Sequence, residues 1–146
     1  LFYQGASRLT FSNWDEEPEP DHQFIDCMYE DNFVFFTGLE SWMDQSFSPA
    51  FAHEGGPNLQ EGCAIRNNVF FVARSAIVYI QTYAEEYFPD FEGNTYVQYA
   101  DIPLIHSDSE NLDMDIYDPQ AAMEVLGDES GTVILLDEEI WGNRLG

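Results

Sequence analysis

The chain has 146 residues and a formal net charge of −24, from 28 acidic residues against four arginines and no lysine. Its length is that of one domain with a real core, and its 45% hydrophobic and 16% aromatic content excludes an apolar-poor, disordered acidic chain. The charge excludes direct nucleic-acid binding, which needs Lys and Arg against phosphates, and no run approaches the roughly 20 apolar residues of a membrane span.

Residues 1–7 begin with Leu-Phe-Tyr-Gln-Gly, which resembles the recognition site of a viral protease used to remove affinity tags, with Tyr and Phe transposed. We therefore interpret residues 1–7 as a tag remnant and residues 8–146 as a single acidic domain.

In the first half of the domain, apolar periodicity separates short strands from short helices. Alternation predicts a strand at residues 8–14, the prolines of residues 15–20 predict a loop, and helical spacing predicts a helix at residues 22–30. A buried strand at residues 33–36, a helix at about residues 38–46 and a long loop at residues 48–62 follow.

In the second half, residues 68–88 predict a central helix, although residues 69–72 also fit a strand. A turn at residues 92–94 precedes a strand at residues 95–99. Asp118 and Pro119 open a helix that Gly127 closes, and residues 132–136 form the last strand. We find no internal repeat, and we expect an α+β fold: one compact domain with a small, mostly antiparallel sheet packed with about four helices.

Two cysteines, Cys27 and Cys63, permit one disulfide without requiring it. Free, buried cysteines are the favoured interpretation, because a chain of this length builds a core without a covalent staple. A cytoplasmic location follows from that interpretation.

Negative charge is concentrated in two segments on either side of a neutral, apolar middle. Ten acids lie in residues 15–44 and sixteen in residues 85–139, while residues 45–84 hold two acids and two arginines. Solubility needs a net charge of only about 2 to 8 in magnitude, so we look for a function of the charge itself.

The densest acidic run is residues 108–118, with five carboxylates. In an extended strand, positions two apart share one face at about 6.6 to 6.8 Å, which would form a ladder of anions. An EF-hand calcium loop does not fit, because Leu112, Asp113 and Pro119 occupy the fifth, sixth and twelfth positions.

Other chemistry lacks a motif. His22, His53 and His106 are far apart and the cysteines show no metal-ligand spacing, so we expect no metal and no cofactor. The chain has neither a phosphate-binding glycine loop nor a nucleophile elbow. We expect no enzyme activity.

The sequence therefore predicts a nucleic-acid mimic: an acidic inhibitor that occupies the DNA- or RNA-binding site of a basic partner, such as a restriction enzyme, a CRISPR effector or another nuclease. In charge and size the chain resembles the phage inhibitors of restriction and CRISPR systems, so the host cell of a phage or mobile element is the expected location. A homodimer is left open. The predicted partner-binding residues are Asp108, Glu110, Asp113, Asp115, Asp118, Glu85, Glu86, Asp90, Glu92, Asp15, Glu16, Glu17 and Glu19.

Two alternatives remain. Adaptation to molar salt would explain an acidic, lysine-free surface and would leave the function unspecified, whereas an immunity protein against a nuclease toxin would share the physics of a mimic. A salt-adapted chain should unfold below about 0.5 M salt, but a mimic must stay folded at physiological ionic strength.

Overall fold

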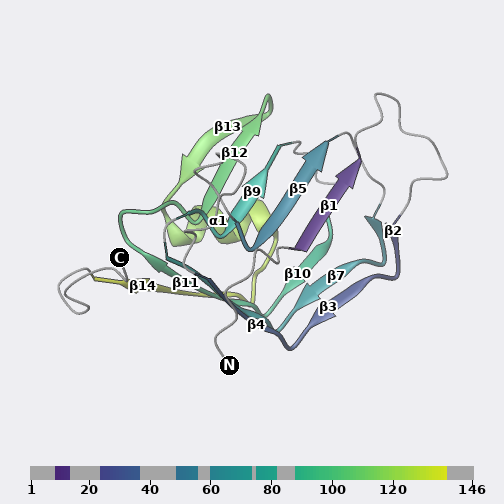
Figure 1. The fold of residues 1–146 in the computed structure, drawn as a ribbon, viewed down its shortest axis with the longest axis horizontal. Coiled ribbons are helices and arrows are strands. Elements are labelled where there is room, and N and C mark those ends of the chain that lie inside the picture. The colour runs from purple at the N-terminus through teal and green to yellow at the C-terminus, as the bar shows by residue number, and fades with distance from the viewer. Residues whose placement is uncertain are drawn as a thin grey trace.

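The computed structural model describes residues 9–13, 24–36, 49–55, 60–73, 75–81 and 88–137. In these residues the chain winds as a parallel β-helix, in which successive turns of the chain stack strand upon strand (Figure 1). Three walls recur along the stack, and we name them sheets A, C and D.

Sheet A has the strand order β1 (Leu9–Asn13), β5 (Phe51–Gly55), β9 (Val78–Ile80), β12 (Ile105–Ser109) and β13 (Leu112–Ile116). Sheet C has the order β10 (Asp90–Glu92), β7 (Ala64–Arg66) and β3 (Met28–Glu30). Sheet D has the order β14 (Thr132–Leu136), β11 (Thr95–Tyr99), β8 (Val69–Val72) and β4 (Phe33–Phe36). A short pair, β2 (Phe24–Ile25) with β6 (Gln60–Glu61), forms sheet B, and the helix α1 is Pro119–Leu126.

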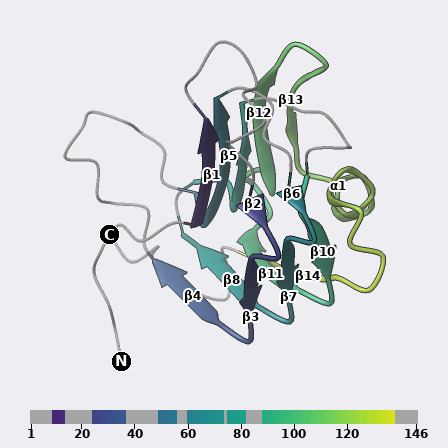
Figure 2. The same ribbon diagram turned by 90° about the vertical axis from the view of Figure 1, so that its right-hand side faces the viewer.

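Each turn of the β-helix before the last visits sheet C, then sheet D, then sheet A (Figure 2). β7, β8 and β9 make one such turn, and β10, β11 and β12 make the next, in parallel register with the strands below. The hairpin of β12 and β13 is the one antiparallel pair among the described strands.

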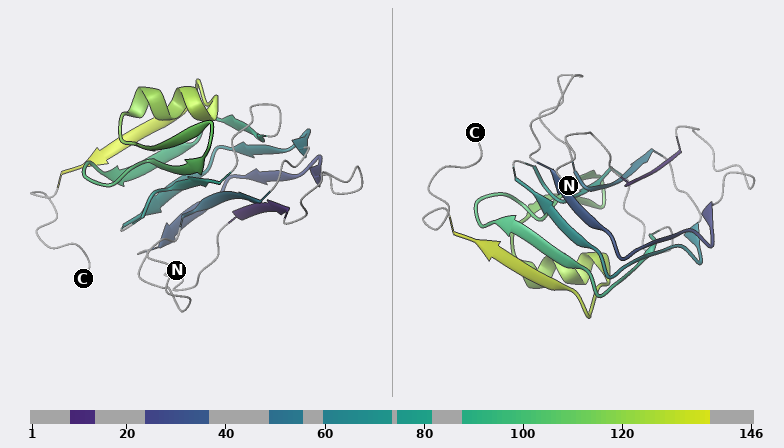
Figure 3. Two further views of the ribbon diagram at one scale, coloured as in Figure 1. Left: turned by 90° about the horizontal axis from the view of Figure 1, so that it is seen from above. Right: turned by 60° about the horizontal axis from the view of Figure 1, so that its bottom comes forward.

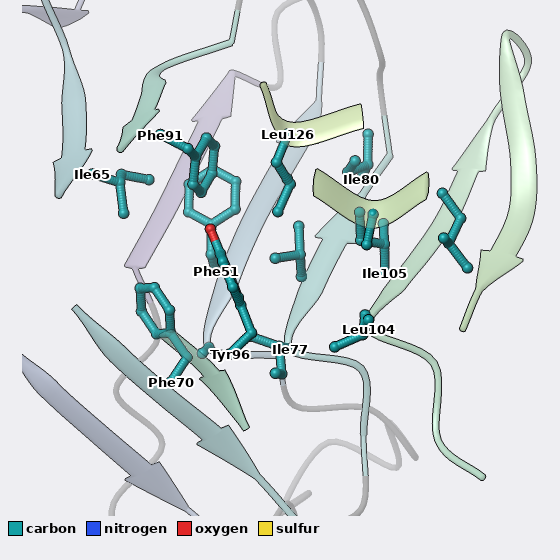
Figure 4. Close-up of a cluster of buried hydrophobic side chains, with 14 of the residues drawn as sticks. Phe51, Ile65, Phe70, Ile77, Ile80, Phe91, Tyr96, Leu104, Ile105 and Leu126 are labelled. Carbon is teal, nitrogen blue, oxygen red and sulfur yellow. The ribbon is translucent and has the colours of Figure 1, made fainter. Parts of the chain in front are cut away.

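The core fills the space between the three walls. Alternate side chains of each strand point inward and meet their register partners one turn away, at the strand spacing of about 4.8 Å. Phe51, Val78, Ile105 and Ile116 form one such buried stack from sheet A. Figure 4 shows Phe51 facing Phe91 and Tyr96 from the other walls, with Leu126 of α1 pointing into the same cluster.

The corner between sheets C and D is built by a repeated pair of residues. Asp31, Asn67 and Gly93 all have positive φ, at 57°, 52° and 67°, which turns the chain sharply. An asparagine follows each of them, and the asparagines hydrogen-bond from turn to turn: Asn32 Nδ2 donates to Asn68 Oδ1 at 3.1 Å, and Asn68 Nδ2 to Asn94 Oδ1 at 3.0 Å.

The ladder ends on Asp128. Its fully buried carboxylate accepts from Asn94 Nδ2 at 3.0 Å, and Gly127 (φ 68°) turns the chain before it, as at the earlier corners. The same glycine closes α1: Gly127 N donates to Glu124 O and Asp128 N to Met123 O, a Schellman C-terminus. In chain order α1 thus replaces the sheet C strand of the last turn, and it lies at one end of the stack (Figure 3).

The expected α+β fold, with a mostly antiparallel sheet and about four helices, is wrong. The described residues hold one helix and largely parallel sheets. The predicted helix at residues 22–30 is two strands, β2 and β3, and residues 69–72 and 78–80 of the predicted central helix are β8 and β9. Asp26, with φ 51°, bends the chain between β2 and β3 and interrupts the alternation of side chains. The apolar residues on either side of the bend therefore have the spacing that is typical of a helix.

Two further predictions are wrong. The supposed loop at residues 48–62 contains β5 and β6. The prediction that the chain has no internal repeat is also wrong. The same corner recurs at spacings of 36, 26 and 34 residues, which are unequal because the connections between strands differ in length.

Several local predictions are confirmed. Strands occur at residues 9–13, 33–36, 95–99 and 132–136, and α1 has Asp118 as N-cap and Gly127 as its C-terminal residue. The predicted helix at residues 38–46 lies outside the described residues.

Neither Cys27 nor Cys63 forms a disulfide, and Cys63 is buried as predicted, but Cys27 is exposed. In the described part of the chain, no helix is long and apolar enough to cross a membrane.

Candidate functional site

The acidic run at residues 108–118 folds into a hairpin, and the hairpin brings part of the predicted ladder together. β12 and β13 pair with Asp108 opposite Asp113 and His106 opposite Asp115. Because strand side chains alternate and Ile105 and Ile116 point into the core, these four residues project from the outer side of sheet A.

His106 lies between two of the carboxylates. Its Nδ1 is 2.6 Å from Asp115 Oδ1 and its Nε2 is 3.3 Å from Asp108 Oδ1. A protonated imidazole donates from both nitrogens, whereas a neutral one donates from only one, so protonation lets His106 bond both carboxylates at once. The three side chains are 35%, 43% and 57% exposed for His106, Asp115 and Asp108.

Tyr79 of β9 extends the cluster to the neighbouring turn. Its ring stacks on His106 at a centroid distance of 5.8 Å, and its hydroxyl donates to Asp108 Oδ2 at 3.0 Å. The register Tyr79–His106–Asp115 across three strands accounts for this contact. We name Tyr79, His106, Asp108, Asp113 and Asp115 the sheet A acidic face.

The remaining predicted residues lie elsewhere. Glu110 is exposed in the turn between β12 and β13, and Asp118 is used as the N-cap of α1, where its Oδ1 accepts from Ala121 N at 2.9 Å. Asp90 and Glu92 belong to β10 of sheet C. Glu85, Glu86, Asp15, Glu16, Glu17 and Glu19 lie outside the described residues.

The surface of the described part is overwhelmingly anionic. Every Asp and Glu whose burial is described is exposed, except Asp128. Arg66 is the one arginine with described surroundings, and its Nε is already 3.1 Å from Glu92 Oε2. Among the described residues, the contacts of this kind to the sheet A acidic face come from His106, whose ring nitrogens lie beside Asp108 and Asp115.

Sequence reasoning missed Tyr79 and His106. For His106 a signal existed: it stands two residues before Asp108, so that any strand through this segment puts both on one face. Tyr79 is 29 residues from Asp108, and only the stacking of turns brings them together.

No group of three or more His, Cys, Asp or Glu in the described residues is arranged to hold a metal ion. Comparison of the chain with protein-family models, with curated proteins and with solved structures gave no match.

Proposed function

We propose that the protein is an acidic inhibitor that presents the sheet A acidic face to a basic nucleic-acid-binding partner, such as a restriction enzyme, a CRISPR effector or another nuclease, in place of DNA or RNA. In this proposal it acts in the cytoplasm of the host cell of a phage or mobile element. The observation that carries the proposal is the excess of exposed carboxylates over cations on the described surface.

The geometry of the face supports binding to a regular array of cations. Asp113 and Asp115 lie two apart on one strand, hence about 6.6 to 6.8 Å apart, and Asp108 stands directly opposite Asp113. A rigid sheet holds these anions in place, so binding orders few main-chain groups. Electrostatic attraction should give fast, salt-sensitive association.

A second candidate is acid–base catalysis on a hydroxyl-rich substrate such as a polysaccharide. It is favoured by His106, which is held between two carboxylates with Tyr79 stacked against it. A histidine in such contacts can transfer a proton, and an exposed sheet face accommodates an extended chain.

The proposed inhibition is tested with purified restriction endonucleases and CRISPR nucleases bound to fluorescently labelled duplex DNA. We expect the protein to displace the duplex from at least one of them at physiological salt, with apparent affinity falling as salt rises. The variant D108N/D113N/D115N should displace at least about tenfold less well.

The matched control is E30Q/D101N/E129Q, which removes the same charge from exposed positions elsewhere. An equal loss in both variants would mean that bulk charge acts rather than this face, and no displacement by the wild type rejects the proposal. H106Q separates the two candidates: it keeps the three carboxylates and so retains inhibition, but it abolishes any release of reducing ends from polysaccharides.

A further inference from the structure

In the described residues, the last turn of the β-helix has no strand in sheet C. Sheet D continues to β14, but in the same turn the chain forms α1 instead of a strand paired with β10, so β10 is the final strand of sheet C in the described residues. Figure 2 shows α1 beside β10 at this end of the stack.

The free edge of β10 carries main-chain groups in strand geometry. Asp90 N donates to Cys63 O at 2.9 Å and Glu92 O accepts from Asn67 N at 3.0 Å, so both residues bond toward β7. In a parallel ladder, bonding alternates between the two sides of a strand. The N–H and C=O of Phe91 therefore point to the opposite edge, toward α1.

A cavity of about 380 Å³ lies at this edge, between β10 and the C-terminal half of α1. Phe88, Pro89 and Val125 give it apolar walls, and Asp90, Glu92 and Glu124 give it an acidic rim. The volume accommodates a short peptide segment, and three extended residues match the length of β10 at about 3.3 Å each.

The charge of the rim selects the occupant. The three acids are exposed, and the one lining cation, Arg66, lies 3.1 Å from Glu92. Glu124 Oε1 accepts from Gln120 Nε2 at 3.0 Å, which holds the carboxylate at the rim and leaves its second oxygen for another donor.

We propose that the cavity between β10 and α1 binds an extended peptide segment bearing Arg or Lys, which pairs with β10 as a fourth strand of sheet C and places a cationic side chain against Asp90 and Glu124. Main-chain pairing would supply affinity and the acidic rim would supply specificity, as in other strand-addition sites. The site is separate from the sheet A acidic face and does not depend on the function proposed for that face.

The test uses a capped pentapeptide of alternating valine and arginine, with its binding to the whole chain measured by calorimetry at low salt. The same peptide with N-methylated main-chain amides, and a version with glutamate for arginine, serve as comparisons. We expect the N-methylated peptide to bind about tenfold more weakly and the glutamate peptide not to bind. Binding of the N-methylated peptide with unchanged affinity overturns strand addition.

Variants locate the site. D90N/E124Q should weaken binding of the arginine peptide about tenfold, whereas D101N/E129Q, with the same charge change, should not. D108N/D113N/D115N should bind the peptide as the wild type does, which separates this proposal from the function proposed above. Peptide binding should also slow hydrogen exchange at the Phe91 amide. Equal loss in the two double variants, or unchanged exchange at Phe91, overturns the proposal.

Discussion

Two stacks of polar side chains cross the turns of this β-helix, one inside and one outside. The inner stack, Asn32–Asn68–Asn94–Asp128, is buried from Asn68 onward, and its members bond to one another and to the main chain. The outer stack, Tyr79–His106–Asp115 with Asp108, is partly exposed. The stacking of turns thus produces both sets of contacts. The buried stack stabilises the fold, and the exposed stack presents polar groups that a partner could contact.

Burial makes the inner stack indispensable. Asn94 Nδ2 also donates to Ile65 O at 2.8 Å, and Asn68 Nδ2 to Tyr29 O at 2.9 Å, so each of these ladder residues ties its corner to the sheet C strand of the preceding turn. A buried polar group without its partner costs about 1–3 kcal/mol. No such cost arises on the outer stack, where water replaces a lost partner.

The largest effect is expected for D128A. Asp128 accepts four hydrogen bonds, from Gly93 N, Asn94 N, Asn94 Nδ2 and Tyr96 Oη, at 2.8 to 3.2 Å. Removing the carboxylate leaves these donors buried without an acceptor, so the free energy of unfolding in urea should fall by about 3–5 kcal/mol.

D128N and D118A calibrate that prediction. D128N keeps one acceptor oxygen and should cost less than D128A. D118A removes only the N-cap bond to Ala121 N and should cost about 1 kcal/mol. If D128A costs no more than D118A, the inner stack does not hold the corner together.

The corner is also where the sequence could have revealed the fold. Asp31-Asn32, Asn67-Asn68, Gly93-Asn94 and Gly127-Asp128 share a residue tolerant of positive φ followed by a ladder residue. Their unequal spacings of 36, 26 and 34 residues hide the period. Local signals were sufficient for α1, whose caps lie within ten residues, but parallel pairing depends on partners too distant for local patterns.

The second effect is alkaline destabilisation through the inner stack. Burial first, and then the adjacent Asp128 carboxylate, raise the pKa of Tyr96 well above its usual value of about 10. The unfolded chain loses this proton near pH 10 while the folded chain keeps it, so the stabilisation is complete below pH 10 and is lost above it. The free energy of unfolding should fall by about 1.4 kcal/mol per pH unit above pH 10 from this group.

Y96F is the matched variant. It loses the bond to Asp128 Oδ2, so it should be less stable than the wild type at pH 8, by about 1 kcal/mol. Its stability should then decline less steeply between pH 10 and 11.5. Burial also raises the pKa of Tyr29, so a shallow decline remains in the variant. Parallel declines in both proteins would contradict the assignment to Tyr96.

For the candidate site, the sequence could predict which carboxylates share a face of a strand, but not that Tyr79 and His106 lie beside them. Asp113 and Asp115 follow from strand alternation, and Asp108 joins them because residues 110–111 form a hairpin turn. Asp118 does not join them because it is the N-cap of α1. Asp90 and Glu92 do not join them because β10 belongs to sheet C and not to sheet A.

The smallest effect is expected on the outer stack. H106Q removes the 2.6 Å contact between Nδ1 and Oδ1, and D115N removes the negative charge from it, but both side chains are more than a third exposed, so water and salt screen what is lost. Each substitution should lower the free energy of unfolding by less than about 1 kcal/mol, measured beside D128A in the same buffer. A loss as large as that of D128A would assign the outer stack to the fold, and its carboxylates would no longer be free to meet a partner.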